Sequence, residues 1–135
     1  AAVTSVCHRY VMTVMATYSN PYFFVSPIEM ERPGPSFTVD TITALTALYG
    51  DRTDFFFITG ADTIRELPTW QDIGRLLDLC HFVAATRPGC IGAIEETVRF
   101  FGARGRRRIH RLSTPEDIAR LVATIEKLLA EIEAR

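Results

Sequence analysis

The sequence predicts an α/β fold, in which an open parallel sheet is covered by helices on both faces. The first observation is that apolar runs of strand composition alternate with segments of helical periodicity along the chain. The second is the run at 54–59, whose unbroken apolar middle predicts a strand buried on both faces of a parallel sheet. We expect one domain over residues 1–135, because a chain of this length buries a core without disulfide or metal.

The first helix is expected between residues 4 and 19, where apolar residues recur at spacings of three and four. The aromatic and β-branched segment at 22–25 predicts a short strand. A loop is expected at 31–35, because neither helix nor sheet accommodates its two prolines and glycine.

The second helix is expected to begin with Ser36 or Thr38 as its N-cap, to hold Asp40 in its first turn and to end at Gly50. The elements after it follow from the same periodicities and from breaks at Gly and Pro. In chain order they are a strand at 54–59, helices at 61–67 and 70–79, a strand at 81–86, a turn at 87–89, a helix at 91–101 and a strand at 108–112.

The last helix, over residues 113–135, has the strongest helical pattern. Ser113 or Thr114 is its expected N-cap, and Pro115 suits its first turn. One apolar stripe is expected to face the core or a partner, and it consists of Ile118, Leu121, Val122, Ile125, Leu128, Leu129 and Ile132.

Composition and charge exclude several classes of protein. The net charge of -1 argues against a dedicated nucleic-acid or membrane-surface binder. No apolar run reaches the roughly 18 residues of a membrane span, and the start lacks a secretory signal pattern. Three irregularly spaced cysteines are no disulfide framework and indicate a cytoplasmic protein. The chain begins with Ala1 rather than Met, so we expect that an upstream piece is absent.

Gly60 and Asp62 lie where the 54–59 strand passes into a helix, which is where open parallel sheets bind ligands. A glycine lets a ligand approach the backbone, and an aspartate there accepts hydrogen bonds from two vicinal ribose hydroxyls. The alternative is a glycine turn followed by an aspartate cap, which the residue types alone favour.

Trp70 and the start of the second helix are the other candidate binding features. The indole of Trp70 follows a proline-broken turn, and it either stacks on a flat heteroaromatic ring or joins the core. The first amides of the helix after 33–37 carry partial positive charge and suit a carboxylate or phosphate. Capping alone also explains Ser36 and Thr38.

No residue is assigned a catalytic or metal-binding role from residue types alone. The arginines between 104 and 111 are able to bind polyphosphate, but clustered charges of this kind more often form a solvent-exposed surface without a ligand. The adjacent Cys–His pairs at 7–8 and 80–81 point in different directions, so we expect neither to chelate zinc. Glycine-rich phosphate loops are missing from the sequence.

Six segments together carry a more specific signal over about residues 5–90. They are His8-Arg9-Tyr10 with Met12, Ser26-Pro27-Ile28-Glu29, Arg32 through Thr41, Phe57 through Asp62, Leu67-Pro68-Thr69-Trp70, and His81-Phe82-Val83 with Arg87-Pro88-Gly89. In this order they resemble the bacterial nicotinate mononucleotide adenylyltransferases, which are nucleotidyltransferases of Rossmann-like fold.

Members of that family transfer AMP from ATP to nicotinate mononucleotide with Mg²⁺ and release pyrophosphate, as a step of NAD biosynthesis. The resemblance implies that Trp70 stacks on the nicotinate ring and that backbone amides near Thr38 and Gln71 receive its carboxylate. It also implies that Gly60 and Asp62 lie against the adenosine ribose of the ATP-derived half. The expected partners are therefore nicotinate mononucleotide and ATP, and the expected cofactor is Mg²⁺.

The sequence departs from the family where the ATP phosphates bind. The family's first strand, glycine-rich loop and His-x-x-His helix start have no counterpart in the sequence, and residues 112–120 only loosely imitate its Ile-Ser-Ser-Thr-x-x-Arg segment. Residues 1–112 are thus family-like, and residues 113–135 form an atypical C-terminal helix. We expect a truncated or re-engineered enzyme with weak or no activity.

Two other functions stay open at this point. A non-catalytic α/β scaffold derived from the family would use its last helix to cover a sheet edge or to form a homo-oligomer. RNA binding through the arginines at 104–111 is a third possibility, and it would depend steeply on salt.

Overall fold

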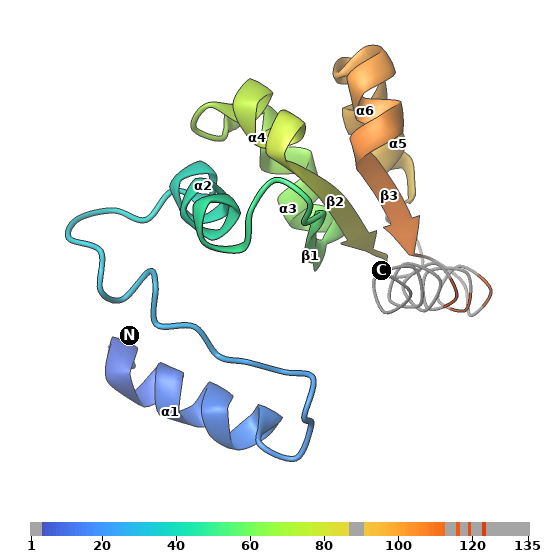
Figure 1. Ribbon diagram of the computed structural model, residues 1–135. Coiled ribbons are helices and arrows are strands. Elements are labelled where there is room, and N and C mark those ends of the chain that lie inside the picture. The colour runs from blue at the N-terminus through green and yellow to red at the C-terminus, as the bar shows by residue number, and fades with distance from the viewer. Residues whose placement is uncertain (1–3, 87–90, 113–115, 117–118, 120–122, 124–135) are drawn as a thin grey trace.

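Three parallel strands form the centre of the computed structural model, which describes residues 4–86, 91–112, 116, 119 and 123 (Figure 1). The strands are β1 (Phe55–Gly60), β2 (Cys80–Ala85) and β3 (Ile109–Leu112), and they lie in the order β1-β2-β3. Phe57 pairs with Phe82, and Val83 pairs with His110. The predicted α/β class with an open parallel sheet is confirmed.

Most of the predicted helices form near their expected places. The helical elements are α1 (Val6–Thr17), α2 (Thr38–Tyr49), α3 (Ala61–Glu66), the 3-10 turn η1 (Leu67–Thr69), α4 (Ile73–Leu79), α5 (Ile91–Phe100) and α6 (Gly102–Arg108). Helix α6 was not predicted, because its glycines and arginines carry no apolar periodicity. Its last turn holds three arginines, which suit the negative end of the helix dipole.

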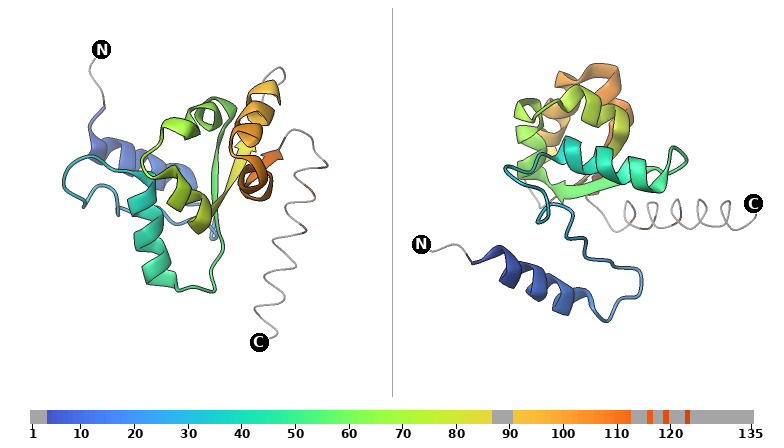
Figure 2. Two further views of the ribbon diagram at one scale, coloured as in Figure 1. Left: turned by 90° about the horizontal axis from the view of Figure 1, so that it is seen from above. Right: turned by 60° about the vertical axis from the view of Figure 1, so that its left-hand side comes forward.

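The core lies on one face of the sheet. Cys80, Phe82 and Ala84 alternate along β2 and point into a cluster that α2, α3, α4 and α5 cover. Sequential strands joined by right-handed crossovers place their connecting helices on the same face, which explains why α3 to α6 gather there. Helix α1 lies on the other side of the sheet, and none of its side chains is buried (Figure 2).

The prediction that the 54–59 strand is buried on both faces is wrong. Side chains along β1 alternate between half-buried and exposed, and Ile58 is 66% exposed. The reason is that only the face with Phe55 and Phe57 packs against the core, whereas on the opposite side of the sheet α1 has no buried residue and does not cover β1. The apolar run instead reflects Phe55 and Phe57, which pack against the core. The prediction of a buried strand holds for β2, where Phe82 and Val83 are buried.

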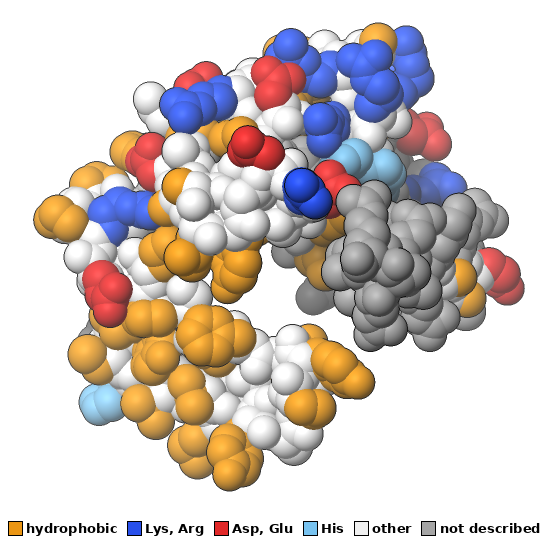
Figure 3. All heavy atoms as spheres, in the orientation of Figure 1, with side chains coloured by type: hydrophobic (Ala, Val, Ile, Leu, Met, Phe, Trp, Pro, Cys, Tyr) orange, Lys and Arg blue, Asp and Glu red, His pale blue; other side chains and the backbone are white. Residues whose placement is uncertain are grey.

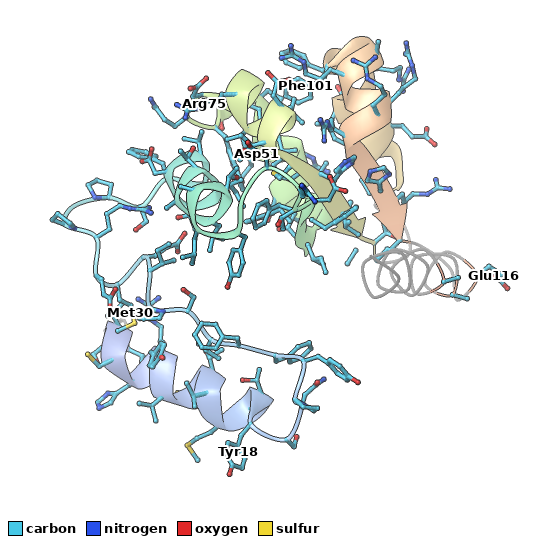
Figure 4. All side chains as sticks on the ribbon, in the orientation of Figure 1. Tyr18, Met30, Asp51, Arg75, Phe101 and Glu116 are labelled. Atoms are coloured by element: carbon cyan, nitrogen blue, oxygen red, sulfur yellow. The ribbon has the colours of Figure 1, made fainter. Side chains whose placement is uncertain are left out.

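The predicted strand at 22–25 is also absent, and the chain there is irregular. Tyr22 is 91% exposed and Phe24 is 83% exposed, so no neighbouring strand uses their β propensity. Tyr18, just before this segment, points away from the sheet (Figure 4). Hydrophobic side chains gather over α1 and the segment after it (Figure 3).

Other predictions lie outside the described residues. These are the turn at 87–89 and most of the helix over 113–135. Within the part of the chain that the structure describes, every helix is too short or too polar to span a membrane.

Candidate substrate-binding site

A cavity of about 290 Å³ opens between the start of α2 and the connection from η1 to α4. Helix α2 packs against α4, so two segments distant in sequence meet here. The predicted site residues Thr38, Trp70 and Gln71 all line this cavity. Its described lining is Ser36, Phe37, Thr38, Thr69, Trp70 and Gln71.

Trp70 is half-buried and is held by two phenylalanines of the sheet. Its ring centroid lies 5.8 Å from that of Phe57 and 6.1 Å from that of Phe82, and both ring pairs are T-shaped. Edge-to-face pairs of this kind fix the orientation of an aromatic ring. Of the two alternatives left open by the sequence, the core role of Trp70 is confirmed, and stacking on a flat ring stays a prediction that its place in the cavity allows.

The start of α2 is open rather than capped by a side chain. The N-cap residue is Phe37, so the prediction that Ser36 or Thr38 caps the helix is wrong. The hydroxyl of Ser36 donates instead to the carbonyl of Glu29 at 3.3 Å. In the described chain, the N–H groups of Thr38 and Val39 have no protein acceptor. The predicted end at Gly50 is confirmed, with φ of 84°.

Gln71, which lines the cavity, is followed directly by a sharp turn of the chain. Asp72 has φ 47° and ψ 46°, the left-handed conformation that non-glycine residues rarely adopt. Helix α4 therefore begins at Ile73. The helix predicted over 70–79 would begin three residues earlier, at Trp70. The one sequence signal for this turn is that aspartate tolerates left-handed backbone angles better than most residues do.

Gly60 and Asp62 lie at the junction of β1 and α3, as predicted, but neither lines the cavity beside Trp70. The space above Gly60 is open, because an added Cβ would meet no described atom within 4 Å. Asp62 is exposed in the first turn of α3. Their contact with an adenosine ribose stays a prediction.

A chain of three polar groups on the sheet was missed by the sequence analysis. Nη1 of Arg108 lies 2.9 Å from Nε2 of His81, and Nδ1 of His81 lies 2.9 Å from Nε2 of His110. Phe56 stacks on His81 with a centroid distance of 4.9 Å. Only the register between β2 and β3 brings the histidines together, and sequence alone does not fix that register.

The same network engages the imidazole that a metal site at the Cys80–His81 pair would need. Both ring nitrogens of His81 are engaged by protein partners, and burial raises the pKa of the Cys80 thiol to about 11, against the opposing charge of Arg108. A thiol in this state is a poor ligand and a poor nucleophile at neutral pH. Cys7, in the other pair, is exposed on α1.

The arginine cluster is largely used within the fold. Arg104 lies 3.6 Å from the carboxylate of Asp78, and Arg111 lies 3.8 Å from that of Glu95. Arg108 also donates to the backbone carbonyl of Asp78 at 3.3 Å. These contacts join α6 to α4 and β3 to α5, which gives the cluster a structural purpose.

Comparison with known proteins gives a consistent family. The sequence pattern of the cytidylyltransferase-like family matches residues 1–127. The chain is 48% identical over 114 residues to a protein of Moorella thermoacetica named "Probable nicotinate-nucleotide adenylyltransferase", covering 84% of this chain and 52% of that protein. Proteins of the same name from Thermoanaerobacter sp. and Paenarthrobacter aurescens are 51% and 54% identical, and the matches cover 67% and 61% of this chain and 43% and 39% of theirs.

The matched region thus spans about half the length, or less, of these curated relatives. The family pattern, which matches residues 1–127, includes the residues that line the cavity beside Trp70. Parallel strands joined by helices agree with this assignment. The chain belongs to the cytidylyltransferase-like family.

Proposed function

We propose that the chain binds nicotinate mononucleotide and represents the pyridine-nucleotide part of a nicotinate-nucleotide adenylyltransferase of NAD biosynthesis. One observation carries the proposal: a single cavity of about 290 Å³ is lined both by the indole of Trp70 and by the open start of α2. A pyridine carboxylate needs both features, an aromatic surface for its ring and hydrogen-bond donors for its charge. The names of the relatives support the same substrate.

In this proposal the nicotinate ring stacks on Trp70. The contacts of Trp70 with Phe57 and Phe82 are edge-on, so the indole is held in place by packing before a ligand arrives. A platform fixed in this way costs little ordering entropy on binding.

The carboxylate of the nicotinate is received by backbone amides near Thr38 and Gln71. Among the described residues, these two N–H groups have no protein acceptor, and both residues line the cavity. The twelve-residue helix α2 adds partial positive charge at its start. Since a carboxamide presents its own N–H donors to such a surface, we expect the acid to bind more tightly than the amide.

ATP is the proposed second substrate, with Gly60 and Asp62 against its ribose. A phosphate oxygen of nicotinate mononucleotide attacks the α-phosphorus of ATP, the bond to the β-phosphate oxygen breaks, and pyrophosphate leaves. Such a transfer depends on positioning and on neutralising charge, so no residue of the chain is needed as a nucleophile. From this role in NAD synthesis we also propose a cytoplasmic location for the protein.

Mg²⁺ is expected from the family resemblance, and the described side chains do not make a cage for it. No group of three or more His, Cys, Asp or Glu side chains comes together among the described residues. Mg²⁺ commonly binds through one or two carboxylates together with substrate phosphates. We therefore propose that the ion enters bound to ATP.

Titration with nicotinate mononucleotide and nicotinamide mononucleotide tests the proposal. Trp70 is the one tryptophan of the chain, so its fluorescence reports the cavity directly. We expect quenching by the acid form at lower concentration than by the amide form. Failure of the acid form to bind would refute the proposed function.

A second assay separates the full enzyme from a binding part. Pyrophosphate release is followed in a mixture of ATP, Mg²⁺ and nicotinate mononucleotide. Turnover supports adenylyl transfer by this chain, whereas binding without turnover supports a pyridine-nucleotide module or scaffold. We expect weak turnover at most, because loss of even one preorganised donor to the transition state costs about a hundredfold to a thousandfold in rate.

A further inference from the structure

One wall of the cavity beside Trp70 is formed by a segment without helix or strand. This segment, residues 26–37, is the second part of the connection between α1 and α2 and is called the strap here. Its last two residues, Ser36 and Phe37, line the cavity. Part of the strap is organised locally, since the N–H groups of Met30 and Glu31 donate to the carbonyl of Pro27 at 2.8 and 3.1 Å.

The strap has room to move on its other side. A second cavity, of about 390 Å³, lies between the strap and α1, and Glu29, Met30 and Ser36 line it. Figure 4 shows Met30 beside α1. Local turns alone leave such a segment free to shift as a unit, so its position relative to α2 must be set by contacts with α2.

The hydroxyl of Thr41 supplies the side-chain link. It accepts a hydrogen bond from Nη1 of Arg32 at 3.0 Å and donates one to Oε1 of Glu29 at 2.8 Å. The other acceptor within reach, the carbonyl of Phe37, is more distant at 3.5 Å. One hydroxyl on α2 therefore joins a cation and an anion of the strap, and both hydrogen bonds are charge-assisted.

Among the described residues, every side-chain hydrogen bond between the strap and α2 involves the hydroxyl of Thr41. Among the described residues, the ion pairs join only Arg104 to Asp78 and Arg111 to Glu95, so Arg32 and Glu29 do not pair directly. At the strap's end, the hydroxyl of Ser36 donates to the carbonyl of Glu29 within the strap, and the carbonyl of Phe37 accepts the backbone N–H groups of Asp40 and Thr41 on α2. Removing the Thr41 hydroxyl thus frees both charged side chains at once.

We propose that Thr41 is a positioning residue for the cavity beside Trp70. Its hydroxyl holds the strap against α2, so that Ser36 and Phe37 form the cavity wall beside the open start of α2 in the position a pyridine carboxylate requires. The proposal rests on the proposed function for its ligand. Its effect falls on the carboxylate, because Ser36 and Phe37 of the strap line the cavity directly before the amide of Thr38, while Trp70 is fixed by the sheet.

Three variants test this role. Thr41→Val removes the hydroxyl and keeps the shape, and Thr41→Ser keeps the hydroxyl. Thr43→Val is the matched control, since the hydroxyl of Thr43 donates at 2.7 Å to Val39 within the same helix and does not touch the strap. Thermal unfolding of each variant verifies that it folds.

We expect Thr41→Val to weaken nicotinate mononucleotide binding about tenfold and to change nicotinamide mononucleotide binding much less. Thr41→Ser should restore the affinity for the acid, and Thr43→Val should match the wild type. The proposal is overturned if Thr41→Val keeps the wild-type ratio of acid to amide affinity, if Thr41→Ser fails to restore it, or if Thr43→Val loses it equally.

A ligand-free measurement separates this proposal from the proposed function. A strap that moves away exposes the indole, so acrylamide should quench Trp70 more strongly in Thr41→Val than in Thr43→Val. If the wild type binds no nicotinate mononucleotide, the proposed function fails, and the quenching alone decides whether Thr41 positions the strap. Equal quenching in the two variants would reject the positioning role.

Discussion

Nδ1 of His81 on β2 lies 2.9 Å from Nε2 of His110 on β3, and Nη1 of Arg108 lies 2.9 Å from Nε2 of His81. Arginine only donates hydrogen bonds, so Nε2 of His81 accepts and its Nδ1 carries the proton. Nε2 of His110 must then accept from His81. Protonating either ring would place two donors against each other, so the network requires both histidines to be neutral.

The first prediction is a loss of stability in mild acid. Burial, followed by the charges of Arg108 and His110, lowers the pKa of His81 below its ordinary 6.5, although Asp54 opposes this. Burial and then Arg108 lower the pKa of His110 in the same way. The unfolded chain therefore takes up these protons first, and the stabilisation is complete above pH 6.5 and is lost as pH falls through the folded-state pKa values.

Urea unfolding between pH 7.5 and 5 measures this effect. The variant His110→Gln keeps an acceptor near the position of Nε2 but does not titrate, so its free energy of unfolding should depend less on pH. His8→Gln, which changes an exposed histidine on α1, is the control and should behave as the wild type. A pH dependence that is identical in all three proteins would contradict the network.

The second prediction concerns the contact between α5 and α6. Gly105 is buried, and an added Cβ would lie 2.5 Å from the carbonyl oxygen of Val98 and 3.0 Å from Cβ of Phe101. Backbone atoms on α5 cannot yield as a flexible side chain would. We expect Gly105→Ala to lower the free energy of unfolding by about 1–3 kcal/mol.

Gly92→Ala is the control for that substitution. Gly92 is exposed on the same helix as Val98, and a Cβ there would meet no described atom within 4 Å. Alanine should stabilise this helix by about 0.5–1 kcal/mol. Both variants are measured in one denaturation series. If Gly105→Ala lowers the free energy of unfolding and Gly92→Ala raises it, the close approach of Gly105 to Val98 is established; changes of the same sign would exclude it.

The third prediction tests Trp70 itself. Trp70→Ala should weaken nicotinate mononucleotide binding by about 1–3 kcal/mol, as the loss of an aromatic stacking surface does. Isothermal titration calorimetry is suitable because the variant lacks the fluorescent probe. Tyr18→Ala removes an aromatic ring that is 88% exposed after α1 and should leave affinity unchanged. Equal affinity of Trp70→Ala and the wild type would remove Trp70 from the site.

Much of the fold follows from local pattern. The predicted strands at 81–86 and 108–112 form within about one residue of their expected ends, since aromatic and β-branched runs bounded by charged or glycine residues leave little choice. Burial was harder to predict. The run at 54–59 is apolar, yet Ile58 is exposed, because burial depends on which elements cover the strand and not on the strand's own sequence.

Three of the five residues predicted for the site line one cavity, and Gly60 and Asp62 do not. Thr38, Trp70 and Gln71 were selected through the family resemblance, and the structure brings them to one cavity. The links that hold this cavity, such as Thr41 between Arg32 and Glu29, depend on how an irregular segment folds back on a helix. Thr41 is nine residues from Arg32 and twelve from Glu29, and no sequence pattern indicates side-chain contacts at these separations.

The fourth prediction uses the unusual backbone of Asp72. Asp72 has a φ of 47° and directly follows Gln71, which lines the cavity, and a β-branched side chain tolerates that angle poorly. Asp72→Val should lower the free energy of unfolding by about 1–2 kcal/mol, whereas Asp72→Gly should be neutral or slightly stabilising.

Asp51 provides the matched comparison for Asp72. Asp51 is exposed in the turn after α2. In the described chain, Asp72 is the one non-glycine residue with positive φ, so glycine at position 51 relieves no backbone strain. At position 51 the stability order of the Val and Gly variants should be the reverse of that at position 72. Asp51→Gly should lower the free energy of unfolding slightly, because glycine increases the entropy of the unfolded chain. Because Asp72→Val also disturbs Gln71, it should weaken nicotinate mononucleotide binding, while Asp51→Val should not. If urea unfolding ranks Val and Gly in the same order at both positions, the left-handed turn does not form in solution.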